Sequence, residues 1–181
     1  LGGNFALRIA ARNVDSPKPF LEKVFAVSPV LDPYKSTAFL DQNFVVYRNY
    51  FLHKWKRSLK RKERLFPEKY DFSRLLNLQT CLAMTEVMLA EYTEFKDLHD
   101  YFGRYTLHRK WFENLTLPVT IIAAEDDPLI DRSDFDELNN CPHLTLKIER
   151  YGGHCGFFTD LAFNCWAEAE VERTIEEESP G

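Results

Sequence analysis

The stretch LPVTIIAAEDDPLI, residues 117 to 130, decides how this sequence is expected to fold. It contains an apolar run that ends near Ala124, followed at once by a turn that holds Asp126, Asp127 and a proline. A short apolar run bounded by turn residues is typical of a strand that is buried on both faces, as in a parallel sheet. The stretch therefore predicts a buried strand with two carboxylates at its carboxyl end.

Two further strands are predicted on either side of this stretch. Residues 24 to 30, VFAVSPV, form another short apolar run bounded by polar residues and prolines. Residues 143 to 151, HLTLKIERY, alternate apolar and polar side chains, which indicates a half-exposed strand near a sheet edge. Helices are expected at 4–12, 133–138 and 160–178. Strands that alternate with helices indicate an α/β fold with a parallel sheet.

Residues 32 to 116 are expected to form a long, mostly helical insertion. Its first helix is predicted over 40–64, with shorter helices near 73, over 80–91 and from 97. We therefore expect two parts: residues 1–31 with 117–181 form the sheet core, and 32–116 form a helical cap or lid. Because three parallel strands make a poor sheet, the core is expected to be the C-terminal part of a larger domain.

The composition is that of an ordinary globular protein, with 45% hydrophobic and 28% charged residues among 181. It contains no apolar run of about 18 residues, so no membrane span is predicted. The formal net charge of −5 argues against nucleic acid as a partner. The four cysteines form no CxxC pair and no metal-type spacing with histidine, so we expect no metal and no cofactor. Free thiols indicate a reducing compartment, either the cytoplasm or the cytoplasmic face of a membrane.

The stretch RYGGHCGFF, residues 150 to 158, places His154 just after the last predicted strand. Its glycines let the backbone turn tightly, so the stretch is suited to present His154 at the end of that strand. If the last two strands are neighbours in a parallel sheet, His154 and the aspartates of the acidic turn meet at one rim. An aspartate there orients the histidine and stabilises its protonated form, which makes the histidine a general base.

Each of these residues also has a purely structural explanation. An aspartate after a strand commonly accepts backbone hydrogen bonds within a turn, and a histidine between glycines can cap a helix. Their order in the chain, acid and then histidine at the ends of consecutive strands, favours the catalytic interpretation. Cys155 beside His154 suggests a Cys–His nucleophile instead, but adjacent residues of an extended segment point to opposite sides, which argues against that pair.

The chain resembles the C-terminal part of an α/β-hydrolase, and most closely its YheT-like branch. The resemblance runs in order along nearly the whole chain. The matching motifs are LGGN at 1–4, AVSPVLDP at 26–33, YRNYFLHKWKRSLKRK at 47–62, FKDLHDYFGRYT at 95–106, the P-x₅-A-x-D-D-P pattern at 118–128 and GGHCGF at 152–157.

The resemblance implies a serine hydrolase of carboxylic esters, of the carboxylesterase or lipase kind, with some members acting as acyltransferases on lipid-like substrates. Asp127 matches the acid of the catalytic triad, with Asp126 the less favoured choice, and His154 matches the base. Leu1 matches the residue after the nucleophile, whose backbone N–H forms half of the oxyanion hole. The nucleophilic serine is then expected just before Leu1, so the chain alone is expected to be inactive. The alternative is a catalytically inactive interaction or scaffold module with the same fold.

The run HKWKRSLKRKERLF, residues 53 to 66, carries lysine or arginine at 54, 56, 57, 60, 61, 62 and 64 against one glutamate. The simplest interpretation is the solvated face of a helix. Nucleic acid binding and peripheral contact with an anionic membrane are the alternatives. The membrane is favoured of these two, since the same helix carries Phe51, Trp55 and Leu59 and a lipid ester substrate would make such contact useful. The cap aromatics Phe44, Tyr47, Tyr50, Phe51, Trp55, Tyr101 and Phe102 suit either an acyl chain or the packing of the cap.

Overall fold

The structure, a computed structural model, describes residues 1–178 and contains two compact units. The first unit is formed by Leu1–Leu31 and Leu107–Gly181, and the second by Asp32–Thr106. Residues 107–116, which the sequence assigned to the cap, belong to the first unit instead. They do so because Leu107, Phe112 and Leu115 are buried in its core.

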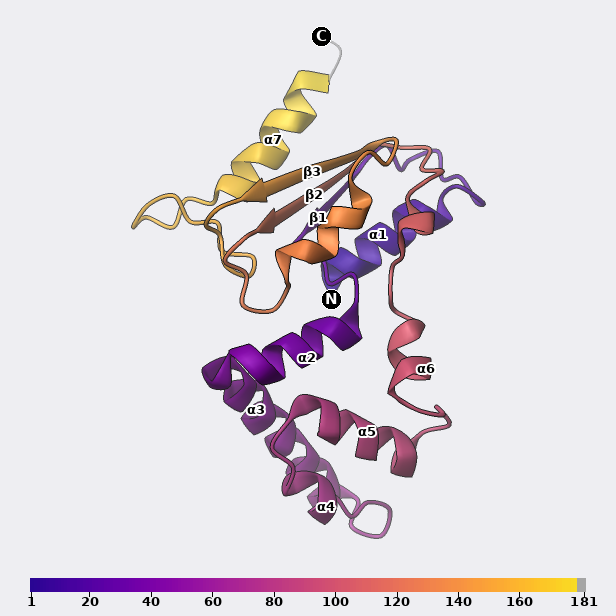
Figure 1. The fold of residues 1–181 in the computed structure, drawn as a ribbon, viewed down its shortest axis with the longest axis vertical. Coiled ribbons are helices and arrows are strands. Elements are labelled where there is room, and N and C mark those ends of the chain that lie inside the picture. The colour runs from indigo at the N-terminus through magenta and orange to yellow at the C-terminus, as the bar shows by residue number, and fades with distance from the viewer. Residues whose placement is uncertain (179–181) are drawn as a thin grey trace. The chain divides into compact units, whose positions relative to one another are not determined.

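The first unit is built on a parallel sheet of three strands in the order β1 (Val24–Val27), β2 (Val119–Ala124) and β3 (Leu144–Glu149) (Figure 1). All residues of the central strand β2 are buried, whereas β3 at the edge is mostly half-buried. β1 ends earlier than its apolar run predicts, because Ser28 adopts a left-handed backbone with φ of 43°.

The alternation of side chains along β2 divides the core of this unit into two layers. One set packs with α1 (Gly2–Arg12) and with the 3₁₀ helix η2 (Arg132–Leu138), and the other packs with α7 (Trp166–Glu178). The first set is Val119, Ile121 and Ala123, and the second includes Ile122 and Ala124. Helices therefore cover both faces of the sheet, as its continuous apolar strand predicted.

The last helix begins later than the sequence predicted, at Trp166 rather than near residue 160. The carboxylate of Asp160 accepts hydrogen bonds from the backbone N–H groups of Ala162 and Asn164, at 2.8 and 3.3 Å. Phe163 has a left-handed backbone with φ of 63°. These features fold residues 160–165 into a tight turn, since an aspartate that bonds its own following backbone competes with helix formation.

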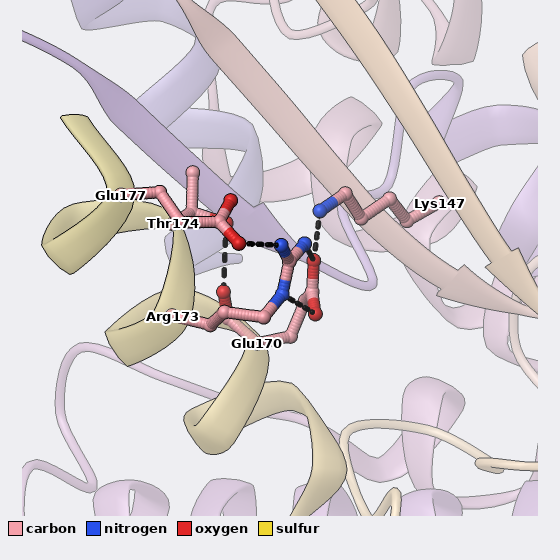
Figure 2. A network of polar contacts seen from close by, with 5 residues as sticks. All are labelled: Lys147, Glu170, Arg173, Thr174 and Glu177. Carbon is pink, nitrogen blue, oxygen red and sulfur yellow. Dashed lines mark hydrogen bonds and ion pairs between the residues drawn. The ribbon is translucent and has the colours of Figure 1, made fainter.

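An ionic network connects α7 to β3 (Figure 2). Glu170 lies at its centre, paired with Lys147 of the strand and with Arg173 of its own helix. Arg173 also pairs with Glu177. The hydrogen bonds with Arg173, followed by the one with Lys147, lower the pKa of Glu170 to about 2. The side chain of Glu170 is only 11% exposed, and its two cations keep it charged although burial favours the neutral form.

The second unit consists of five helices. They are α2 (Pro33–Asn43), α3 (Val45–Leu65), α4 (Ser73–Leu76), α5 (Cys81–Tyr92) and α6 (Leu98–Gly103). The single helix predicted over 40–64 is wrong, because the backbone breaks at Phe44, where φ is −127° and ψ is 75°. The Phe44 ring packs there between the rings of Phe39 and Tyr47.

A buried carboxylate organises the middle of this unit. Asp41, 7% exposed, accepts hydrogen bonds from the backbone N–H groups of Cys81 and Leu82, at 2.8 and 2.9 Å. It therefore satisfies two of the N–H groups that begin α5 and have no partner within that helix. Within residues 1–178, none of the helices combines the length and apolar character that crossing a membrane would require.

Candidate active site

Asp127 and His154 form a hydrogen-bonded pair at the carboxyl ends of β2 and β3. The His154 Nδ1–H group donates to Asp127 Oδ2 over 2.9 Å. Asp127 is 4% exposed, and its Oδ1 accepts a hydrogen bond from the backbone N–H of Leu129 at 2.8 Å. Both carboxylate oxygens are thus committed, which fixes the direction in which the carboxylate faces the imidazole. The structure brings together the two residues that the sequence placed at one rim.

Asp126 has a different role from its neighbour. Its Oδ1 accepts hydrogen bonds from the backbone N–H groups of Gly152 and Gly153, at 2.9 and 2.8 Å. Asp126 therefore holds the backbone of the histidine turn, residues 152–157, which follows β3. The next residue, Asp127, contacts the imidazole of the same turn. Two consecutive carboxylates are the only sign of this contact in the sequence.

The histidine turn is closed by its own backbone and by one aromatic ring. The Gly152 carbonyl accepts hydrogen bonds from the N–H groups of Gly156 and Phe157, at 3.1 and 3.0 Å. A Cβ atom on Gly152 would lie 2.5 Å from the ring of Phe157 and 3.0 Å from Cβ of Ala124. Only glycine fits at this position, because the buried ring occupies the space that any side chain would need.

The environment of His154 favours its protonated form. The hydrogen bond with Asp127 is the main reason that the pKa of His154 rises to about 9, and the Cys155 thiol also raises it. Partial burial lowers the pKa of His154, but this effect is smaller than the combined effect of Asp127 and Cys155. Because Nδ1 is occupied by Asp127, Nε2 is the nitrogen available for proton transfer. The arrangement gives an oriented imidazole with unusually strong basicity.

The structure corrects the argument made from the sequence about Cys155. The segment is not extended at this point, since Cys155 has a left-handed backbone with φ of 68°. The thiol consequently lies beside the imidazole, and the hydrogen bond with His154 is the main cause that lowers the pKa of Cys155, ahead of the opposing effect of burial. The turn therefore holds a Cys–His pair in addition to the Asp–His pair.

Ser28 is a site residue that the sequence argument missed. It follows β1, is 3% exposed, and its Oγ has no hydrogen-bond partner of ordinary geometry among the described residues. Its hydroxyl nevertheless lies close enough to the Cys155 thiol to lower the pKa of that thiol. A serine directly before Pro29 is the only trace of this in the sequence, and it does not by itself indicate a site.

Leu1 lies at the N-cap position of α1, and its side chain is 82% exposed. Its carbonyl accepts a hydrogen bond from the Phe5 N–H at 3.2 Å. The start of α1 adjoins the carboxyl end of β1, because a Cβ on Gly3 would lie 3.0 Å from the carbonyl oxygen of Val27 and from Cα of Pro29. α1 thus begins at the same rim of the sheet where Asp127 and His154 meet.

Two features of the second unit bear on the sequence predictions. The basic run lies on α3, where Leu52 and Leu59 are buried and most of the charged side chains are exposed. Phe51, Trp55, Tyr101 and Phe102 line a cavity of about 510 Å³.

Within residues 1–178, no group of three or more histidine, cysteine, aspartate or glutamate side chains is placed to hold a metal ion.

The chain is similar to two curated proteins, and no protein-family model matches it. It is 24% identical over 159 residues to an abhydrolase domain-containing protein of Dictyostelium discoideum, covering 85% of this chain and 40% of that protein. It is also 24% identical over 128 residues to human protein ABHD15, covering 68% of this chain and 27% of that protein. The chain therefore spans less than half the length of these curated relatives.

Among solved structures, the chain is similar to an esterase of Pyrococcus furiosus in two crystal forms. The first gives a TM-score of 0.48 at 12% identity and covers 95% of this chain and 49% of that one. The second gives a TM-score of 0.44 at 11% identity and covers 94% of this chain and 49% of that one.

Proposed function

We propose that this chain, which is that of an α/β-hydrolase fold protein, supplies the acid and the base of a serine hydrolase that cleaves carboxylic esters. Asp127 is the acid, His154 is the base, and the nucleophile is a serine directly before Leu1 in a longer protein. The observation that carries the proposal is the 2.9 Å hydrogen bond between Asp127 Oδ2 and His154 Nδ1. It lies beyond the carboxyl ends of adjacent parallel strands, where open α/β sheets bind their ligands.

The mechanism is acyl transfer through an acyl-serine. Neutral His154 takes the proton of the serine hydroxyl as its oxygen attacks the ester carbonyl, and it then gives this proton to the departing alcohol. Asp127 orients the ring and stabilises the imidazolium formed in the first step. The backbone N–H of Leu1 is one donor to the oxygen of the tetrahedral intermediate. Water then hydrolyses the acyl-serine, with His154 again acting as the base.

The raised pKa of His154 sets the pH dependence of this reaction. A histidine that must be neutral to accept a proton is only partly active at neutral pH when its pKa is about 9. Ester turnover is therefore expected to increase with pH until the imidazole is neutral. In the longer protein the serine hydroxyl also interacts with His154. The pKa obtained from the pH dependence of turnover therefore describes the serine, the histidine and the aspartate together.

We further propose that the substrates are lipid-like esters and that the protein belongs to the YheT-like branch. The motifs at 1–4, 26–33 and 152–157 support the branch. Lipid-like esters are the substrates that the resemblance to this branch implies. An acyltransferase reaction uses the same acyl-serine, with an alcohol other than water as the acceptor.

The test uses the longer protein that contains the residues preceding Leu1. The replacement His154→Ala is expected to reduce turnover of p-nitrophenyl butyrate by about a thousandfold, because the base is lost while the binding surface remains. His53→Ala is the matched control, since His53 is exposed on α3 and is expected to leave turnover unchanged. A fluorophosphonate probe, which labels activated serines, identifies the nucleophile by peptide mapping.

Either of two results would overturn the proposal. One is unchanged turnover in the His154→Ala protein. The other is a residue other than serine directly before Leu1, combined with no fluorophosphonate labelling. In that case the fold serves as an interaction or scaffold module, and the hydrogen bond between Asp127 and His154 is structural.

A further inference from the structure

We propose that Cys155 is a covalent modification site for neutral electrophiles with an apolar tail, of the α,β-unsaturated carbonyl class. Three observations within the first unit carry the inference: a cavity beside the thiol, the imidazole of His154 next to it, and the unpartnered hydroxyl of Ser28. The inference goes beyond the proposed ester hydrolysis and does not depend on a serine nucleophile.

The cavity defines which electrophiles reach the thiol. It has a volume of about 470 Å³ and is lined by Val27, Cys155, Cys165, Ala167, Glu168, Val171 and Glu172. The side chains of Val27, Ala167 and Val171 provide apolar walls for a hydrocarbon tail. Glu168 and Glu172 are both exposed carboxylates in the lining, so a negatively charged reagent is repelled and a neutral one is not.

Cys155 differs from the other cysteines in both access and activation. It is exposed, whereas Cys81 and Cys141 are buried. Burial raises the pKa of Cys81 to about 12. Cys165 lines the same cavity, but its Sγ donates a hydrogen bond to the Gly156 carbonyl at 3.3 Å and is less exposed. Reactive cysteines are accessible thiols beside a cationic group, and only Cys155 among these four meets both conditions.

Ser28 provides the independent sign that a ligand belongs here. Its hydroxyl is buried without a hydrogen-bond partner of ordinary geometry in the described part of the chain, and it lies against the Cys155 thiol. A buried polar group left without a partner costs free energy, which a bound acceptor restores. The carbonyl oxygen of an electrophile that approaches the sulfur is such an acceptor, and its growing negative charge strengthens the hydrogen bond.

The addition requires no oxidant and no further reactant. The Cys155 thiolate forms a bond to the β-carbon of the electrophile, and the π electrons of the C=C bond move toward the carbonyl to give an enolate. The His154 imidazolium then donates its proton to the α-carbon. The product is a thioether on Cys155 beside a neutral imidazole, so atoms and charge balance.

The experiment treats the folded chain with N-ethylmaleimide and N-hexylmaleimide and follows each cysteine by peptide mass mapping. At neutral pH, Cys155 is expected to react at least about tenfold faster than Cys165, because it is more accessible and the hydrogen bond with His154 lowers the pKa of its thiol. The hexyl reagent is expected to react faster than the ethyl reagent with Cys155, and this preference should disappear in Val171→Trp, which fills the cavity.

A second pair of reagents tests the charge of the cavity. Iodoacetamide and iodoacetate differ by one negative charge, and the ratio of their rates at Cys155 is expected to exceed the ratio measured for free cysteine. The double replacement Glu168→Gln with Glu172→Gln should reduce this ratio to the free-cysteine value.

The role of the neighbours is tested by two substitutions and a control. His154→Gln is expected to slow modification of Cys155 by about tenfold or more, since the thiol then loses its cationic partner. Ser28→Ala removes only a hydroxyl and should slow the maleimides more than iodoacetamide, whose attacked carbon carries no developing oxyanion. His108→Gln, at an exposed histidine of the first unit, serves as the control.

Equal rates for Cys155 and Cys165 would overturn the proposal, as would a rate at Cys155 that neither His154→Gln nor Ser28→Ala changes. These outcomes are separate from failure of the ester hydrolase, which is judged by fluorophosphonate labelling and ester turnover. If the protein hydrolyses esters while Cys155 is unreactive, the proposed ester hydrolysis stands and the proposal about Cys155 is wrong.

Discussion

Asp127 Oδ2 and His154 Nδ1 lie 2.9 Å apart although 27 positions separate the two residues in the chain. The parallel pairing of β2 with β3 makes this possible, because Ala124 and Glu149 lie opposite each other at the ends of these strands. The contact is therefore a consequence of the sheet and not of the local sequence. The second oxygen of Asp127, held by the Leu129 N–H, prevents the carboxylate from rotating away.

This contact predicts the titration of His154. In Asp127→Asn, the midpoint for His154 is expected to fall from about 9 toward the ordinary value of about 6.5, because the hydrogen bond to a carboxylate is the largest cause of the shift. The measurement is the pH dependence of the histidine Cε1–H resonances in NMR spectra. Asp126→Asn is the matched control, since its side-chain oxygen can still accept from Gly152 and Gly153. Equal midpoints in Asp127→Asn and the unsubstituted protein would contradict the prediction.

The same shift predicts how stability depends on pH. A group whose pKa is raised on folding contributes stability that is fully present below the unfolded value and is lost as pH rises through the folded value. For His154 the loss falls between about pH 6.5 and pH 9. Urea unfolding across this range should show a decrease in the free energy of unfolding that is smaller in Asp127→Asn.

The ion pairs of Glu170 predict that the protein loses stability at acidic pH. Its pKa is lowered to about 2 by Arg173 and Lys147, so its contribution is present above the unfolded value and is lost as pH falls between about pH 4.3 and pH 2. Glu170→Gln is expected to lower the free energy of unfolding at neutral pH by about 1 kcal/mol, a value kept small because Arg173 is half-exposed.

The control for Glu170 is Glu177→Gln, which removes an exposed partner of the same arginine. Its effect at neutral pH is expected to be smaller than that of Glu170→Gln, because the Glu177 side chain is 60% exposed whereas that of Glu170 is 11% exposed. The check is urea unfolding at several pH values. An equal acid-induced loss in Glu170→Gln and the unsubstituted protein would show that the ion pairs of Glu170 contribute nothing to stability.

The basic face of α3 leads to a proposal about membranes. We propose that its exposed cations bind anionic lipid surfaces, with each cation near the surface contributing about 1 kcal/mol. Replacing Lys60 and Arg61 by glutamine is expected to reduce sedimentation with phosphatidylserine vesicles and to have no effect with phosphatidylcholine vesicles. The matched control replaces Lys110 and Arg150, exposed cations of the first unit. Equal binding by both variants would identify nonspecific attraction.

The sheet and the meeting of Asp127 with His154 were predictable from the sequence because both depend on simple patterns. A wholly apolar run predicts a central strand, an alternating run predicts an edge strand, and parallel strands bring their following turns to one rim. The resemblance to α/β-hydrolases pointed to the same pair. These features follow from the periodicity of apolar side chains, so they can be predicted without knowledge of individual backbone angles.

The missed features depend on individual backbone angles that no periodicity reveals. The break at Phe44 occurs inside a pattern that is helical on both sides. The left-handed backbone at Cys155 reverses the expectation that neighbouring side chains diverge. The boundary at Leu107 follows from tertiary packing, since residues 107–116 contain little regular structure apart from η1 (Arg109–Trp111).

The two adjacent carboxylates after β2 have a consequence for how this turn can change. Asp126 contacts the backbone of the histidine turn and Asp127 contacts its ring, so each contact depends on the position of its carboxylate in the chain and not on its charge alone. Inserting or deleting one residue between Ala124 and Asp126 would offset both contacts together. This loop therefore tolerates exchange of its side chains, for example Glu125, far better than any alteration of its length.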